Sequence, residues 1–279
     1  MQFFGTWKAY LLMCLMIMLL QPFWMLVSRE TAPGRHRAAC PETTGSIRKK
    51  AIAEAVFCLL TACAVAALFQ LYPGNSLLPD VDPSVFLYIG KRMTAGSLPY
   101  RDLFDHKGPL LYLIQYAGAL LSDEGRGVWF LEVLNLAVTF WIQLRICRLV
   151  TDRPSAGWLS ILLVFGMCGW NVYQGGNFAE EYALPWISLG MYVFLRFFKT
   201  GEVRLGQIVL LGLGFGAVFL LRVNMAAIWP ALVPAVLIVL LKNKRADRIL
   251  PCIFAFLAGC AAIVLPVVLL AAAEGFLQD

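Results

Sequence analysis

The sequence predicts an all-α membrane protein that crosses the bilayer several times, and three observations support this fold class. Hydrophobic residues make up 60% of the 279 residues and charged residues only 14%, with a mean hydropathy of +0.74. Apolar runs recur along the chain, and they approach the roughly 20 residues that cross a hydrocarbon core of about 30 Å. These runs lack the alternating pattern of a barrel strand, and a helix satisfies its own backbone hydrogen bonds in lipid.

The apolar runs predict spans at residues 9–28, 51–71, 128–148, 155–171, 181–198, 205–221, 226–241 and 249–270. The first of them resembles a signal anchor, although only Lys8 precedes it closely and it has no clear cleavage site, so its place in the mature protein is open. We therefore expect residues 1–47 to form a hydrophobic segment with a cytoplasmic linker. Residues 48–279 form a transmembrane module of about seven spans.

The net charge of +6 does not indicate a nucleic-acid partner, because the cations gather at the ends of spans. Four basic clusters follow one another: Arg48, Lys49 and Lys50; Arg145, Arg148 and Arg153; Arg196, Lys199 and Arg204; and Lys242, Lys244, Arg245 and Arg248. The positive-inside rule assigns all four clusters to the cytoplasm. An even number of crossings must then separate each neighbouring pair of clusters.

The run at 109–121 is too short to cross the bilayer, since its residues would make a helix of about 20 Å. We expect it to lie on or dip into the outer leaflet, so that residues 72–127 form one long external loop. A second helix is predicted in this loop, with Asp82 as its N-cap and Pro83 as its first residue. Its apolar face would comprise Val85, Phe86, Ile89 and Met93, and Gly96 would end it. The predicted architecture is thus a helical bundle with two interfacial helices in its first external loop.

This loop is unusually rich in polar residues for a connector between membrane helices. Between Asp80 and Leu121 it holds four Asp, several Lys and Arg, and one of the two His of the chain. Carboxylates beside cations at a bilayer surface predict a site that handles a phosphate group and a proton.

Two features of the loop carry a resemblance to a known family. Asp82 stands ahead of the first interfacial helix, and Lys107-Gly108-Pro109-Leu110 opens the second, after Tyr100-Arg101-Asp102 and Asp105-His106. Over about residues 48–270 the chain resembles the polyprenyl-phosphate-sugar-dependent glycosyltransferases of the GT-C fold. The similar branch contains the protein O-mannosyltransferases, the lipid A aminoarabinose transferases and the rhizobial lipopolysaccharide glycosyltransferases. Such proteins usually continue with further spans, so the resemblance implies that residues 48–279 lack a C-terminal part.

The resemblance implies transfer of a sugar from a polyprenyl-phosphate carrier to a glycan, lipid or protein acceptor, at the outer face of the cytoplasmic (plasma) membrane. Asp82 would act as general base, with Asp80 as its substitute, and the phosphate would be bound by Arg101, His106, Lys107 and Arg222. Four carboxylates would bind the acceptor or a metal: Asp102, Asp105, Glu180 and Glu181. These acidic residues are compatible with a bound divalent metal, but they do not require one.

Plainer roles exist for the same residues. Asp82 could simply cap a helix, Arg101 and Lys107 could extend toward lipid headgroups, and the two Glu could stabilise a helix N-terminus. Glu132 and Asn135 share a helical face that we expect to point into the bundle. Two other functions remain open: a non-catalytic or truncated scaffold, and a transporter or lipid flippase. The transporter predicts ionisable residues near mid-span, whereas those of this chain lie near span ends.

Overall fold

A computed structural model describes residues 44–75, 79–122, 125–151 and 176–273, and within them the chain folds into helices joined by short turns. The helices are α2 (Thr44–Ala66), α3 (Val81–Thr94), α4 (Pro109–Leu121), α5 (Arg126–Val150), α7 (Ala179–Thr200), α8 (Leu205–Leu221), α9 (Ile228–Lys242) and α10 (Ile249–Ala273). Two 3-10 helices, η1 (Val223–Ala227) and η2 (Ala246–Arg248), precede α9 and α10. The prediction of an all-α fold is confirmed for these residues. The predicted spans 9–28 and 155–171 lie outside them.

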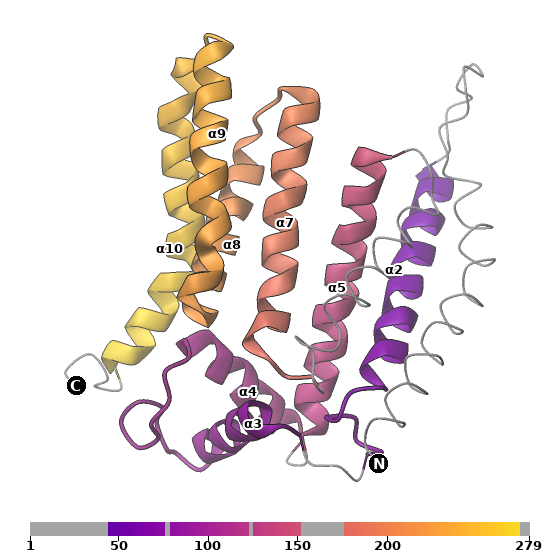
Figure 1. The fold of residues 1–279 in the computed structure, drawn as a ribbon, viewed down its shortest axis with the longest axis vertical. Helices are drawn as coiled ribbons and strands as arrows, with labels where there is room; N and C mark the ends of the chain where they lie inside the picture. The colour runs from indigo at the N-terminus through magenta and orange to yellow at the C-terminus, as the bar shows by residue number, and fades with distance from the viewer. Residues whose placement is uncertain (1–43, 76–78, 123–124, 152–175, 274–279) are drawn as a thin grey trace.

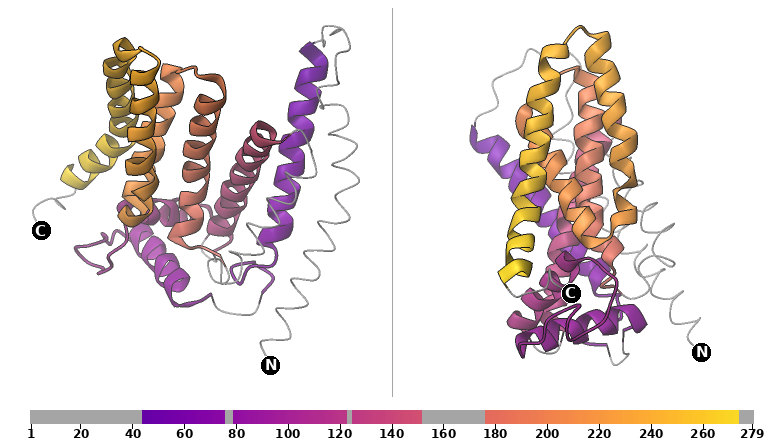
Figure 2. Two further views of the ribbon diagram at one scale, coloured as in Figure 1. Left: turned by 45° about the horizontal axis from the view of Figure 1, so that its top comes forward. Right: turned by 90° about the vertical axis from the view of Figure 1, so that its left-hand side faces the viewer.

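The helices α2, α5, α7, α8, α9 and α10 run roughly side by side, and α3 and α4 lie across one end of the group (Figure 1; Figure 2). We call this end the loop end. The start of α5, the start of α7 and the end of α8 also lie there. The opposite end receives the start of α2 and the ends of α5, α7 and α9. The described parts of all four basic clusters lie there, so we call it the basic end.

Three helical stretches are long and apolar enough to cross a membrane, namely Arg126–Val150, Val223–Lys242 and Ala246–Leu270. The shorter apolar helices are Ala51–Ala66, Pro109–Leu121 and Leu205–Leu221. Length and composition therefore make the described chain a membrane protein with three clear candidate spans.

Two hydrophobic clusters hold the helices together. One joins α2 to α5, and its largest buried side chains include Phe57 and Phe140. The other joins α3 and α4 to α7, α8 and α9 around Phe86, Tyr112 and Trp229. The two helices of the loop end are therefore packed onto the bundle through a shared core. Burial of this kind provides most of the stability of short helices.

Helix α3 begins two residues earlier than predicted. Its N-cap is Asp80, whose Oδ1 accepts a hydrogen bond of 2.7 Å from the backbone N–H of Val81. The prediction of Asp82 as the cap was wrong, because proline is tolerated throughout the first turn and does not mark its first residue. On the predicted apolar face, Phe86 and Ile89 are buried, whereas Val85 is exposed.

Candidate functional site

The loop before α4 is fixed to the end of α8 by a close backbone contact. The N–H of Gly108 donates to the carbonyl of Leu221 over 3.0 Å. A Cβ atom at position 108 would lie 2.0 Å from the carbonyl oxygen of Leu220, so only glycine allows this approach. The contact brings Lys107 and Arg222, the neighbours of the two bonded residues, to the same place at the loop end.

Lys107 is paired with Asp82, and the two residues are exposed to very different extents. Nζ of Lys107 lies 3.4 Å from Oδ2 of Asp82, with 8% of the lysine side chain exposed against 52% of the aspartate. The ammonium also lies 5.9 Å from the ring centroid of Phe86, and the hydroxyl of Tyr100 donates to the Lys107 carbonyl over 2.6 Å. The structure thus joins the predicted base to a predicted phosphate ligand. Because Asp80 caps the helix, Asp82 is not needed for that role.

A second ion pair lies beside the first. The guanidinium of Arg222, the C-cap residue of α8, contacts the carboxylate of Glu180 in the first turn of α7. Both side chains are partly exposed. Asp82, Lys107, Glu180 and Arg222 therefore come from four separate segments to one end of the bundle, and we call these four residues the loop-end site. Two carboxylates and two cations at one place can accept a proton and bind a phosphate.

The other predicted loop residues make contacts with their sequence neighbours. Nε and Nη2 of Arg101 each lie 3.0 Å from a carboxylate oxygen of Asp102. That hydrogen bonding to Arg101, and a bond from the N–H of Leu98, lower the pKa of the Asp102 carboxyl. His106 is largely exposed, with Nδ1 3.2 Å from Oδ1 of Asp105. These contacts join the four residues as two neighbouring pairs within the loop.

Two tyrosines and Asp105 form a buried polar cluster that was not predicted from the sequence. The rings of Tyr100 and Tyr112 meet edge to face with centroids 5.6 Å apart. Oδ2 of Asp105 and the hydroxyl of Tyr112 are both buried without a partner at hydrogen-bonding distance. Burial, with the Asp105 carboxylate nearby, raises the pKa of both tyrosines. The only sequence signal was the position of Tyr100 beside Arg101 and Asp102.

The two adjacent glutamates of α7 face different ways. Glu180 contacts Arg222, whereas Glu181 is fully buried and lies beside Glu132 of α5. Glu132 is also fully buried, and Nδ2 of Asn135 donates to the Glu181 carbonyl over 2.7 Å. The prediction that Glu132 and Asn135 point into the bundle is confirmed. The expectation of two carboxylates acting together at one surface does not match this geometry, and in the described segments no three His, Cys, Asp or Glu side chains gather as a metal site.

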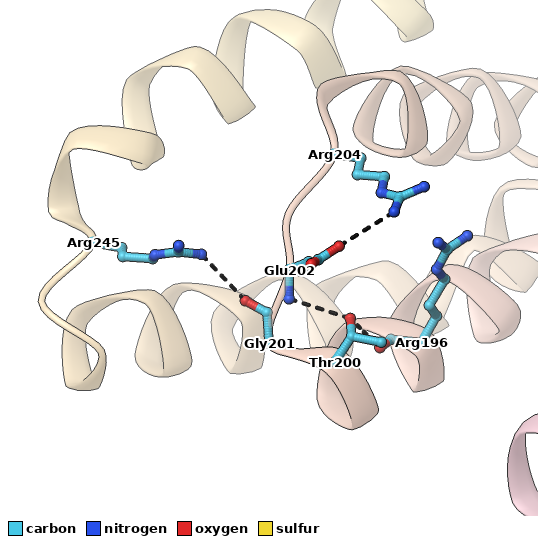
Figure 3. Close-up of polar contacts among 6 residues, drawn as sticks. All are labelled: Arg196, Thr200, Gly201, Glu202, Arg204 and Arg245. Carbon is cyan, nitrogen blue, oxygen red and sulfur yellow. Dashed lines mark hydrogen bonds and ion pairs between the residues drawn. The ribbon is translucent and has the colours of Figure 1, made fainter.

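The basic end shows a different arrangement of charge. Nη1 of Arg245 donates to the carbonyl of Gly201 over 3.4 Å, which holds the connection between α9 and α10 against that between α7 and α8 (Figure 3). Glu202 pairs with Arg204 two residues away, over 3.3 Å, and its N–H donates to Oγ1 of Thr200 (Figure 3). Two of the predicted basic clusters thus meet at this end.

Comparisons with known proteins correct the resemblance drawn from the loop. A search of curated proteins and a search of solved structures gave no match to the chain. The resemblance to GT-C glycosyltransferases through Asp82 and residues 107–110 is wrong as a family assignment, because a different family model covers most of the chain. That model matches residues 47–278 and is described as "Putative competence-induced protein Ccs4 N-terminal domain", and the chain belongs to this family.

Proposed function

We propose that the loop-end site transfers a sugar from a polyprenyl-phosphate carrier to an acceptor hydroxyl. The observation that carries this proposal is the pair of Asp82, a carboxylate open to solvent, and Lys107, a buried ammonium, at one end of an apolar bundle. The description of the family names a condition of induction and no reaction, so the support comes from the site itself.

Each charged group has a role in such a transfer. Asp82 accepts the proton of the acceptor hydroxyl as the new bond to the sugar forms. Lys107 and Arg222 stabilise the charge that develops on the departing phosphate. A phosphate that enters the site competes with Asp82 and Glu180 for these cations, and this competition frees the Asp82 carboxylate to take the proton.

The position of the site suits a lipid-linked donor. By the positive-inside rule the basic end would face the cytoplasm and the loop end the outer surface, where nucleotide sugars are absent. Several apolar side chains on the loop end are exposed: Val81 by 73%, Tyr88 by 56% and Phe104 by 96%. Such side chains favour α3 and α4 as interfacial helices of an external loop over residues 72–127, within a module of about seven spans. The prenyl chain would stay in the bilayer while its phosphate reaches the site.

The remaining candidates lie in the loop before α4. Arg101 and His106 are exposed in the loop and are available to the donor phosphate or the sugar. Asp102 and Asp105 hold these two residues by the contacts described above. The acceptor, a glycan, lipid or protein hydroxyl, would approach Asp82 from the solvent side.

Radiolabelled polyprenyl-phosphate sugars, offered as a panel to membranes that contain the protein, test the proposal. We expect transfer from at least one donor, and loss of that transfer in Asp82→Asn. The Glu202→Gln variant removes a carboxylate from the basic end and serves as the matched control with normal transfer. Equal transfer by the Asp82→Asn protein and the wild type would exclude Asp82 as the base.

The proposed orientation has its own test. In a background without native cysteines, Asp102→Cys should react with an impermeant maleimide in intact cells, whereas Asp247→Cys should react only after lysis. Both positions are solvent-exposed, so access to the reagent depends on the side of the membrane. The reverse labelling pattern would put the loop-end site in the cytoplasm and remove the argument for a lipid-linked donor.

A non-catalytic membrane scaffold is the second candidate, and one observation favours it. All four residues of the loop-end site are already paired with an opposite charge of the same chain. In a scaffold, the sole role of these pairs would be to hold α3, the loop before α4, α7 and α8 together. Folded protein that transfers sugar from no donor in the panel would support the scaffold.

A further inference from the structure

Two carboxyl groups lie against each other inside the bundle, away from the loop-end site. Glu132 of α5 and Glu181 of α7 each have 0% of their surface exposed. Oε2 of Glu132 and Oε1 of Glu181 are buried, and neither has a hydrogen-bond partner among the residues that the structure describes. Backbone covers this place closely, because a Cβ atom at Gly176 would lie 2.9 Å from Oε2 of Glu132 and 2.7 Å from the ring of Phe69.

The other oxygen of each carboxyl group is satisfied by a backbone donor. Oε1 of Glu132 accepts from the N–H of Asn177 over 2.8 Å, and Oε2 of Glu181 accepts from the N–H of Phe178 over 3.3 Å. The titratable group that faces the pair is the Tyr182 hydroxyl of α7, which donates to Oδ1 of Asn177 over 2.9 Å. The side-chain amide of Gln115 on α4 donates to the same oxygen of Asn177. Among the groups acting on the pair in the described chain, none is a cation.

Two ionised carboxylates cannot occupy this site together. Each buried charge without a counter-ion costs several kcal/mol, and two like charges in contact add repulsion. A single proton between the two unpartnered oxygens removes one charge and gives both oxygens a hydrogen-bond partner. Carboxyl pairs of this kind hold and release protons as one unit.

We propose that Glu132 and Glu181 form a proton-binding site in the bundle, with one proton shared between Oε2 of Glu132 and Oε1 of Glu181. This proton joins α5 to α7 where their side chains would otherwise repel. The proposal does not depend on any transferase activity at the loop end.

The proton site is connected to the loop end through Asn177. The backbone of Asn177 donates to Glu132, and its side-chain Nδ2 donates to the carbonyl of Pro83 over 3.2 Å. Pro83 directly follows Asp82 in the first turn of α3. Loss of the shared proton would push Glu132 and Glu181 apart, displace Asn177, and loosen the start of α3. The occupancy of the site therefore sets how firmly Asp82 is held.

Infrared spectroscopy of the purified protein tests the proposal, because the carbonyl stretch of a protonated carboxyl group differs from that of a carboxylate. At pH 7 we expect one such band in the wild type, its loss in both Glu132→Gln and Glu181→Gln, and its retention in Glu202→Gln. A spectrum without this band at pH 7, or a band that survives both glutamine substitutions, would overturn the proposal.

Thermal unfolding in detergent gives a second measurement, which compares how the stability of the wild type and of one variant depends on pH. The folded pair retains a proton that an unfolded glutamate releases above about pH 4.3, so the stability of the wild type should fall as the pH rises. In Glu181→Gln the amide supplies a permanent donor to Glu132, and this slope should be smaller. An identical slope in the wild type and Glu181→Gln would contradict a shared proton.

Discussion

The two ends of the bundle use ion pairs in different ways. At the loop end the pairs of the loop-end site join residues that are far apart in sequence, Asp82 with Lys107 and Glu180 with Arg222. The pairs of neighbours in this loop lie outside that site. At the basic end the exposed pairs join near neighbours, Glu202 with Arg204 and Asp247 with Arg248. A pair between near neighbours can form in almost any conformation of the chain, whereas a long-range pair requires the folded bundle. The long-range pairs of the loop-end site therefore depend on how α3, α7 and α8 are packed, whereas the exposed pairs at the basic end mostly face solvent.

Glu54 of α2 is the exception at the basic end. Its side chain is 4% exposed, with Oε1 2.8 Å from Nη1 of Arg148 and Oε2 3.5 Å from Nη2 of Arg145. Two guanidinium groups from α5 therefore neutralise a carboxylate that is nearly as buried as Glu132. Among the described residues this buried acid has two cations for partners, whereas no cation acts on Glu132 and Glu181.

The largest expected effect is on the loop end. Asp82→Asn should lower sugar transfer by about 100-fold to 10,000-fold, the range expected when a general base is lost. The helix should persist, because Asp80 supplies the N-cap. Initial rates in membranes with matched protein levels measure the change. Asparagine caps a helix as well as aspartate does, so Asp80→Asn removes the carboxylate and keeps the cap. If Asp80→Asn abolishes transfer while Asp82→Asn retains it, the base is Asp80.

The second effect tests the exception at the basic end. Replacing both Arg145 and Arg148 by leucine leaves Glu54 buried without a counter-ion, which should reduce the free energy of unfolding by about 3–5 kcal/mol. Adding Glu54→Gln to this double variant should recover most of the loss, because the buried charge is then gone. Denaturant unfolding in detergent measures both. Equal stability of the double and triple variants would show that the two arginines stabilise the protein by packing alone. One such packing contact is that of Arg145 over the ring of Trp141.

The sequence was sufficient for most of the helices and for the residues of the loop-end site, but not for the way in which those residues pair. The bounds of α4 and α8 match the predicted runs 109–121 and 205–221, because a proline or a charged residue bounds each apolar run. All four residues of the site were candidates, since charged residues stand out by composition in a mostly apolar chain. The family was misassigned because a few loop residues are a small part of a chain whose other residues are mostly interchangeable apolar side chains.

The contacts between helices could not be predicted from the sequence. Periodicity shows which face of a helix points inward, as it did for Glu132, but not which residue of a neighbouring helix it meets. The separation of Glu180 from Glu181 depends on the angle at which α7 packs on α5 and α8. The same is true of Arg222, because its pairing with Glu180 depends on how α7 and α8 pack against each other.

A smaller effect is expected from the cation of the loop-end site. Lys107→Met keeps much of the buried side-chain volume and removes one charged partner of the phosphate, which should raise KM for the donor by roughly 10-fold to 100-fold. Folding should be retained, because the Asp82 carboxylate left behind is half exposed and can be solvated. Donor titrations at saturating acceptor separate KM from kcat. An unchanged KM would mean that Arg222 alone binds the phosphate.

The smallest effect should come from the exposed pair at the basic end. Glu202 and Arg204 are 62% and 59% exposed, so water screens their attraction and Glu202→Gln should change the free energy of unfolding by less than about 1 kcal/mol. Any change should shrink further in high salt, where exposed charges are screened within a few ångströms. The glutamine keeps the backbone N–H that bonds to Thr200, so the turn itself is preserved. A loss comparable to that of the Arg145 and Arg148 double variant would show that the neighbouring pair is a structural element, and the contrast between the two ends would fail.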